Sequence, residues 1–238
     1  MPYRRLPKTD QARIRALKMA VESSVENGVF TNVLSHNTYH KAKEFLQKFS
    51  AEVAVYKRCV QEQSSKRGNE NYEAALKKAR MYVSHFIQVL SMCIMRGEVA
   101  RSKRPYYGLP ENEDTIPNLF PEASVLEWGR KVIEGEQRRQ GEGGIPIYNP
   151  TMGRVSVVYE MFKEMYEKQQ MLQQRTNEAL RNISDMRYEA DELIYEAWAE
   201  IEKAFSSFSA DARLKNCARY GVIYYERPDR KHKKEANG

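Results

Sequence analysis

The fold of this chain is decided by residues 155–204, which read VSVVYEMFKEMYEKQQMLQQRTNEALRNISDMRYEADELIYEAWAEIEKA. Apolar or small side chains recur there every three or four positions, and no Gly or Pro occurs between Arg154 and Arg219. An average spacing of 3.5 residues puts these side chains on one stripe of an α-helix, which must be buried against other helices. This seam consists of Val155, Val158, Phe162, Met165, Leu172, Ala179, Ile183, Met186, Ala190, Leu193 and Ala197, with Gln169 and Thr176 as polar members.

The seam shifts by one residue after Leu193, to Ile194, Trp198, Ile201, Phe205 and Phe208. Just before this shift, Asn182, Ser184 and Asp185 favour a local turn. We therefore predict a helical hairpin with its bend near 181–188. One continuous helix with a local phase shift is the alternative.

Apolar periodicity predicts further helices in the first half of the chain. A first helix begins at the N-cap Thr9 and ends at Asn27-Gly28. Two longer helices occupy about 38–97, with Ser35 or Asn37 as the first cap, and the short polar turn between them at 64–69 favours antiparallel packing. A proline-rich, loop-rich connection follows at 98–149, with one helix beginning near Pro121.

We predict an all-α fold: an antiparallel helical bundle of four main helices in two hairpins, with accessory helices. The hairpins lie at about 38–97 and 150–208, and Asn149-Pro150 starts the second as N-cap and first helical residue. A short helix at about 209–219 and a short extended segment at 222–225 complete a single domain over 1–226. The basic tail at 227–238 is predicted to be disordered.

The net charge of +7 is concentrated at the two ends of the chain. Residues 1–20 and residues 213–235 each carry a net charge of +5, so the remainder is mildly acidic, at −3. Basic ends are typical of solvated tails, although they can add salt-sensitive affinity for phosphates. A protein that reads nucleic acid usually gathers its positive charge on a structured face instead.

The compartment is indicated by the cysteines and by the absence of long apolar runs. Cys59, Cys93 and Cys217 are odd in number and widely spaced, which fits a reducing cytoplasm better than a disulfide framework. The first twenty residues lack the apolar region of a signal peptide, and no apolar run approaches the ~20 residues of a membrane span. We expect a cytoplasmic protein with no membrane partner.

Several segments between about residues 40 and 225 form a recognisable set. They are KAR (78–80) running into YVSHFIQVL (82–90), YGL (107–109), LEWG (126–129) followed by GE (135–136), GGIPIYNPT (143–151), and EADELI (189–194) leading to Trp198. Together they resemble a family of uncharacterised, all-helical bacterial proteins. The resemblance implies a bacterial cytoplasmic helical protein. Because the family has no assigned activity, it transfers no catalytic residue.

The helix expected to end near Gly97 carries one polar stripe. Residues 82–94 are apolar nearly all round, which predicts a helix inside the bundle. His85, Gln88 and Met92 share one face of it. They indicate either a polar site in the bundle interior, with His85 as a base or ligand, or a histidine hydrogen-bonded to a facing helix, which is the commoner arrangement.

A second group of candidate binding residues lies in or near the loops: Arg104, Tyr106, Tyr107, Trp128, Arg130, Tyr148 and Asn149. If the loops at 98–121 and 143–150 meet at one end of the bundle, these residues form an aromatic and basic surface. Such a surface suits a partner protein, a sugar or an anionic ligand. Alternatively, the aromatic residues only pin the loops to the bundle.

The sequence contains no recognisable catalytic or metal-binding constellation. None of the four histidines has a Glu three residues before it, as a di-metal carboxylate bundle requires. His36 and His40 can share one helix face, but no third ligand lies nearby in sequence. Residues 141–144 are not followed by the Lys and Ser or Thr of a phosphate loop. We therefore predict no metal, no cofactor and no catalytic residue.

The sequence favours a non-enzymatic interaction or structural protein, with an unknown protein partner or self-association as a homodimer. The first alternative is a nucleic-acid-associated protein that uses its basic termini. The second is a small-ligand or enzyme site near His85 or the 98–150 loops.

Overall fold

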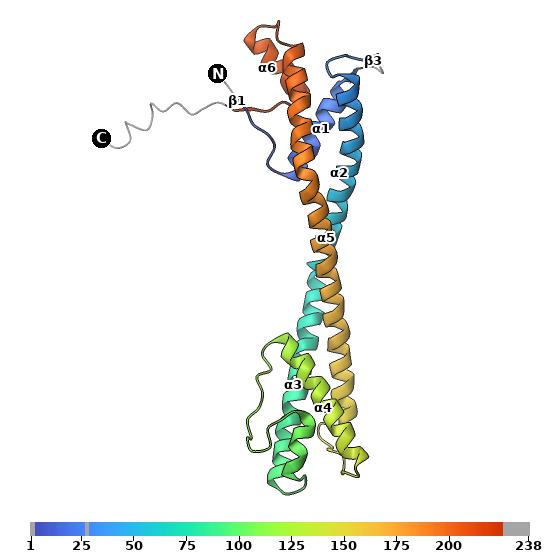
Figure 1. Ribbon diagram of the computed structural model, residues 1–238, viewed down its shortest axis with the longest axis vertical. Helices are drawn as coiled ribbons and strands as arrows, with labels where there is room; N and C mark the ends of the chain where they lie inside the picture. The colour runs from blue at the N-terminus through green and yellow to red at the C-terminus, as the bar shows by residue number, and fades with distance from the viewer. Residues whose placement is uncertain (1–2, 27–28, 226–238) are drawn as a thin grey trace, which may run out of the picture. The chain divides into compact units, whose positions relative to one another are not determined.

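The computed structural model describes residues 3–26 and 29–225, and its regular structure is almost entirely helical (Figure 1). The predicted all-α class is confirmed. Two antiparallel pairs of very short strands are present: β1 (Tyr3–Arg4) with β4 (Tyr224–Tyr225), and β2 (Val25–Glu26) with β3 (Val29–Phe30). The helices are α1 (Asp10–Ser23), α2 (His36–Gln63), α3 (Lys66–Met95), the 3-10 helix η1 (Arg101–Tyr107), α4 (Glu122–Gly141), α5 (Met152–Ala204) and α6 (Ala210–Arg219).

The longest element, α5, is one uninterrupted helix, so the predicted bend near 181–188 is wrong. The predicted seam itself is buried or half-buried along its whole length. On a straight helix, a 3.5-residue seam drifts by about 20° per heptad, or roughly 110° between Val155 and Leu193. A shift of one residue turns the seam by about 100° in the opposite sense and therefore restores its direction. The shift after Leu193 is thus what a continuous helix requires.

The chain divides into two compact units, each with its own core. The first unit comprises residues 1–60 and 175–238, and the second comprises residues 61–174. Helices α1, α2 and α6 and the later part of α5 supply the first core, whereas α3, η1, α4 and the start of α5 supply the second. Of the two predicted hairpins, the one at 150–208 is therefore a single helix, and the one at 38–97 is divided between two cores. The stretch predicted as one domain, 1–226, is thus divided between two compact units.

Two of the predicted helix starts are confirmed and one is wrong. Thr9 caps α1 and Ser35 caps α2, each by accepting at 3.2 Å a hydrogen bond from the backbone N–H three residues on. Asn149 and Pro150, which are joined by a cis peptide bond, precede α5 and do not begin it. The carbonyl of Thr151 instead accepts the first helical hydrogen bonds, from the N–H groups three and four residues on.

The other predicted boundaries agree with the structure in part. The turn expected at 64–69 is shorter, because α3 already begins at Lys66 and includes Gly68. The short helix near 209–219 is confirmed as α6, and the extended segment at 222–225 ends in β4. The first helix ends at Ser23 and is followed by β2, so its predicted end at Asn27-Gly28 is wrong; the tail at 227–238 lies outside the described residues.

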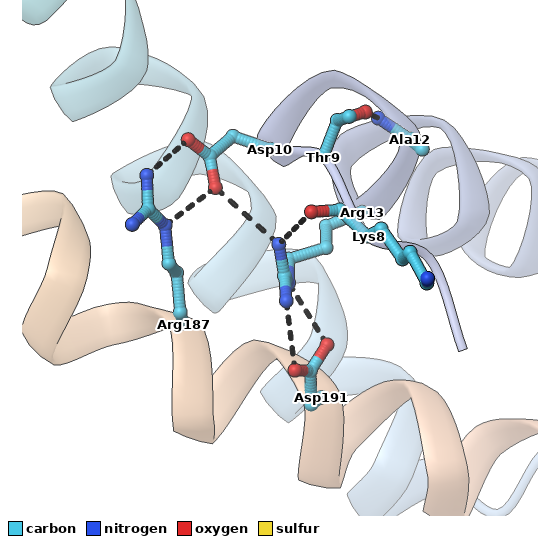
Figure 2. Close-up of polar contacts among 7 residues, drawn as sticks. All are labelled: Lys8, Thr9, Asp10, Ala12, Arg13, Arg187 and Asp191. Carbon is cyan, nitrogen blue, oxygen red and sulfur yellow. Dashed lines mark hydrogen bonds and ion pairs between the residues drawn. The ribbon is translucent and has the colours of Figure 1, made fainter.

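Two bidentate ion pairs hold α1 against α5 in the first unit (Figure 2). Arg187 donates to both carboxylate oxygens of Asp10, and Arg13 donates to both oxygens of Asp191, all at 2.8–2.9 Å. Arg13 also lies 3.5 Å from Asp10, which joins the pairs into one network. Hydrogen bonding from Arg187 holds the pKa of Asp10 below its ordinary value. Because planar bidentate pairs fix direction as well as distance, this network sets the register of α1 on α5.

A glycine in the middle of α4 allows close packing in the second unit. A Cβ atom on Gly135 would come within 2.7 Å of both the carbonyl oxygen of Tyr106 and the ring of Tyr107. A glycine in a helix interior lowers helix stability by up to about 1 kcal/mol relative to alanine. Here the missing side chain lets η1 lie directly on α4. The packing brings the Tyr107 side chain to the polar residues that follow Gly135.

Candidate functional site

The polar stripe of α3 lies at the surface, not in the interior. His85 and Met92 are exposed, and Gln88 is half-buried and donates to the Ser84 hydroxyl at 3.3 Å. The helix buries its other face, with Val83, Phe86, Ile87, Leu90 and Ile94. The expected interior position of His85 is therefore wrong, because only part of this apolar helix is covered by its neighbours.

The loop residues predicted as one surface are divided by the structure. Arg104 and Tyr107 are fully buried. Arg104 donates to the Pro110 carbonyl at 2.7 Å and to the Ser91 hydroxyl at 3.0 Å, so it ties the loop after η1 to α3. In contrast, Tyr148 and Asn149 are exposed.

The remaining candidates are engaged with close neighbours. Tyr106 is half-buried, with the Arg138 guanidinium 3.9 Å from its ring centre. Trp128 is half-buried with the Lys131 ammonium 4.5 Å from its ring centre. Arg130 is exposed and pairs with Glu134 one turn further along α4. None of these three side chains lines either of the two pockets, described below, to which Tyr148 and Asn149 contribute.

A buried ion pair on α4, which no sequence motif marks, positions the loop at 143–147. Tyr107 donates to Glu136 at 2.6 Å, and Arg139 donates to both carboxylate oxygens of Glu136 at 2.7 and 3.0 Å. Arg139 also donates to the Ile145 carbonyl at 2.7 Å, and the Ile147 N–H donates to Glu136 at 3.3 Å. The pair thus fastens η1 and the loop to α4 at once.

The electrostatics of this pair follow from its burial and its hydrogen bonds. Burial by itself would raise the pKa of Glu136, but the hydrogen bonds from Arg139 and Tyr107 outweigh it and lower that pKa. Burial and the hydrogen bond to Glu136 raise the pKa of the Tyr107 hydroxyl. Glu136 is therefore ionised and Tyr107 neutral at ordinary pH, so the cluster is charge-balanced by Arg139.

The loop at 143–151 borders a pocket of about 290 Å³ that brings together three predicted candidates: His85, Tyr148 and Asn149. Met81 and Tyr82 on α3, Pro150, Thr151 and Arg154 complete the lining. The Arg154 guanidinium lies 5.8 Å from the centre of the Tyr82 ring. The N-terminal end of α5 adds partial positive charge, so this end of the surface suits a carboxylate.

A second, more apolar pocket of about 430 Å³ adjoins the first, because Tyr148 and Asn149 line both. Ile145 and Tyr148 are about three-quarters exposed, at 76% and 74%. Met92 is exposed and lies on the same face of α3 as His85 and Val89, by its spacing. We call the two pockets together the α3 groove; it is lined by Met81, Tyr82, His85, Val89, Cys93, Arg96, Glu98, Val99, residues 145–151 and Arg154.

Tyr82 and Arg154 line the α3 groove although they carry no recognisable motif. One local signal points to Arg154: a basic side chain in the first turn of a helix opposes the helix dipole and gains nothing from it. Tyr82 has no such signal, because an aromatic residue on an apolar helix predicts core packing.

One thiol and one guanidinium group in the α3 groove are constrained by their surroundings. Burial raises the pKa of the Cys93 thiol, which disfavours the thiolate, and Arg96 is held by Glu98 at 2.6 and 2.9 Å.

His36 and His40 stack at the start of α2 with their ring centres 5.6 Å apart. Within residues 3–26 and 29–225, no group of three or more His, Cys, Asp or Glu side chains is placed to hold a metal ion.

Among the described helices, none combines the length and the apolar character needed to cross a membrane. Comparison of the chain with protein-family models, with curated proteins and with solved structures finds no match. The family resemblance and the cytoplasmic location therefore stay predictions.

Proposed function

We propose that this chain is a non-enzymatic interaction protein whose α3 groove binds an apolar segment of a partner protein that carries a carboxylate at one end. The observation that carries the proposal is the row of exposed apolar side chains along the groove, Met81, Ile145 and Tyr148. Exposed apolar side chains that flank a groove are typical of protein-binding surfaces, and methionine adapts readily to a partner.

The charge of the α3 groove supports an acidic partner. Arg154 and His85 line one pocket, next to the positive end of the α5 dipole. The other pocket is lined mainly by apolar side chains, including Val89, Val99 and Ile145. A segment with apolar residues followed by an acidic side chain or a C-terminal carboxylate matches this order.

The alternative of a nucleic-acid-associated protein receives less support from the basic N-terminal stretch. Arg4 pairs with Glu202 at 3.1 Å and Arg13 pairs with Asp191 at 2.8 Å. These guanidinium groups are engaged within the protein, which reduces the positive charge that is free to meet phosphates.

Selection from a random peptide library displayed on phage tests the proposed function. We expect enriched peptides to combine apolar residues with Asp, Glu or a free C-terminus. Their affinity should fall at least tenfold on Met81→Glu and on Arg154→Glu, because each change places a negative charge against the acidic ligand. The matched control is Met171→Glu, which changes an equally exposed methionine of α5 that does not line the groove.

Two results would contradict the proposed function: no enriched peptide, or enriched peptides that bind Met81→Glu as tightly as wild type. Light scattering on the wild type tests the other possible occupant of the groove, a second copy of this chain. A dimer that Met81→Glu dissociates would assign the groove to a second copy of the chain in place of a separate partner.

A further inference from the structure

The first unit carries an exposed aromatic and acidic surface on α5. Tyr188 and Tyr195 are seven residues apart, so they lie on one face of the helix, about 10.5 Å apart along its axis. Tyr188 is 72% exposed. An open pocket of about 530 Å³ is lined by Leu6, Tyr188, Asp191, Glu192, Tyr195 and Glu196, and we call it the tyrosine groove.

Arg4 shows how this helix face binds a guanidinium. Arg4 lies on the short strand β1, with its guanidinium carbon 4.2 Å from the centre of the Tyr195 ring. The same guanidinium pairs with Glu202 at 3.1 Å. An arginine on an extended segment is thus held by stacking on a tyrosine together with a charge-assisted hydrogen bond to a carboxylate of α5.

Tyr188 offers the same chemistry to a group from outside. Among the described residues, no cationic side chain lies over its ring, in contrast to Tyr195. Glu192, one turn further along α5, is exposed and lines the groove beside it. Arg4 is held by the same two chemical groups, although its carboxylate, Glu202, is half-buried and lies seven residues beyond Tyr195.

The charge of the tyrosine groove is locally acidic. Asp191 is neutralised by Arg13, but Glu192 and Glu196 are both exposed, and no basic side chain lines the pocket. Charge complementarity therefore favours a basic partner for this groove.

We infer that the tyrosine groove binds an arginine in an extended basic segment of a partner protein, with the guanidinium stacked on Tyr188 and paired with Glu192. Arginine is favoured over lysine because its planar guanidinium stacks on an aromatic ring and pairs with a carboxylate at the same time. The surface is separate from the α3 groove and uses none of its residues.

Fluorescence anisotropy with two labelled peptides tests this inference. In one short blocked peptide arginine alternates with glycine, and in the other lysine replaces arginine. We expect the wild type to bind the arginine peptide at least threefold more tightly than the lysine peptide. Tyr188→Ala should weaken the arginine peptide about threefold to tenfold, and Glu192→Gln should weaken it and flatten its salt dependence.

The matched control is Phe120→Ala, which removes a highly exposed aromatic side chain of the second unit and should leave the affinity unchanged. Because Tyr188 is exposed, its loss leaves the helix intact, which circular dichroism checks. Equal binding of both peptides with an unaltered affinity for Tyr188→Ala would overturn the inference, since it would indicate diffuse attraction to acidic residues. Absence of binding by the arginine peptide would overturn it as well.

Discussion

Replacement of Glu136 by Gln should lower the free energy of unfolding of the second unit by about 3–5 kcal/mol, the cost of leaving a buried charge without its partner. Glu136 is fully buried, and it accepts hydrogen bonds from Tyr107, Arg139, Gln140 and the Ile147 N–H. Glutamine keeps the size of the side chain but removes the charge that balances Arg139. The variant therefore loosens both η1 and the loop that forms one side of the α3 groove.

The effect of Glu136→Gln can be measured by urea unfolding followed by the fluorescence of Trp128. A Trp198→Phe background removes the tryptophan of the first unit, so that the signal reports on the second unit alone. The matched control is Glu134→Gln on the same helix. Glu134 pairs with Arg130 at the surface, where both side chains are more than half exposed. Exposed pairs of this kind contribute at most about 0.5 kcal/mol, so the control should unfold almost like the wild type. Equal losses in the two variants would contradict the assigned role of Glu136.

The same substitution has a defined pH dependence. The pKa of Glu136 is lowered in the folded protein, so its contribution to stability is fully present above the ordinary carboxyl pKa of about 4.3. That contribution is lost as the pH falls through the lowered pKa. The stability difference between wild type and Glu136→Gln should therefore be constant from about pH 7 to about pH 5 and shrink in stronger acid.

The second large effect is expected for Trp198→Ala in the core of the first unit, with a loss of about 3–5 kcal/mol. Trp198 is fully buried, so its truncation leaves a cavity that packed helices cannot fill. Trp198→Phe should cost much less. It keeps most of the apolar contacts, and it removes an indole N–H that has no hydrogen-bond partner among the described residues.

Urea unfolding followed by far-ultraviolet circular dichroism compares the two Trp198 variants. Tyr188→Ala is the control, because it truncates an aromatic side chain on the same helix that is 72% exposed, and it should change stability by less than about 0.5 kcal/mol. If Trp198→Ala were no less stable than Tyr188→Ala, Trp198 would not be a core residue of the first unit.

The periodic pattern of α5 predicts the class of the fold and the buried side of this helix correctly, because burial is a property of one face. It does not predict the path of the chain. The shift after Leu193 has the same appearance in a hairpin and in a straight helix whose seam has drifted, and the polar residues Asn182, Ser184 and Asp185 tolerate helical geometry on an exposed face. The hairpin and the continuous helix can be distinguished only from the tertiary structure, in which the chain forms two separate cores.

The candidate site is predictable in part. His85, Tyr148 and Asn149 are singled out by the sequence in two unrelated groups, and tertiary packing brings them to one pocket. Glu136 and Arg139 have the spacing of an ordinary surface pair, like Arg130 and Glu134 on the same helix. The one signal of their burial is the helical glycine before Glu136, because a glycine within a helix indicates close approach of another segment.

Both proposed binding surfaces use α5, so the continuity of this helix is the central structural claim. Spin labels on cysteines at Glu178 and Glu192 test it within the first unit, because both side chains are exposed and the native cysteines are buried. These positions are fourteen residues apart. A continuous helix predicts a backbone separation of about 21 Å in double electron–electron resonance. A hairpin bent near 185 would place the two positions side by side, about 10 Å apart, and that distance would contradict the account.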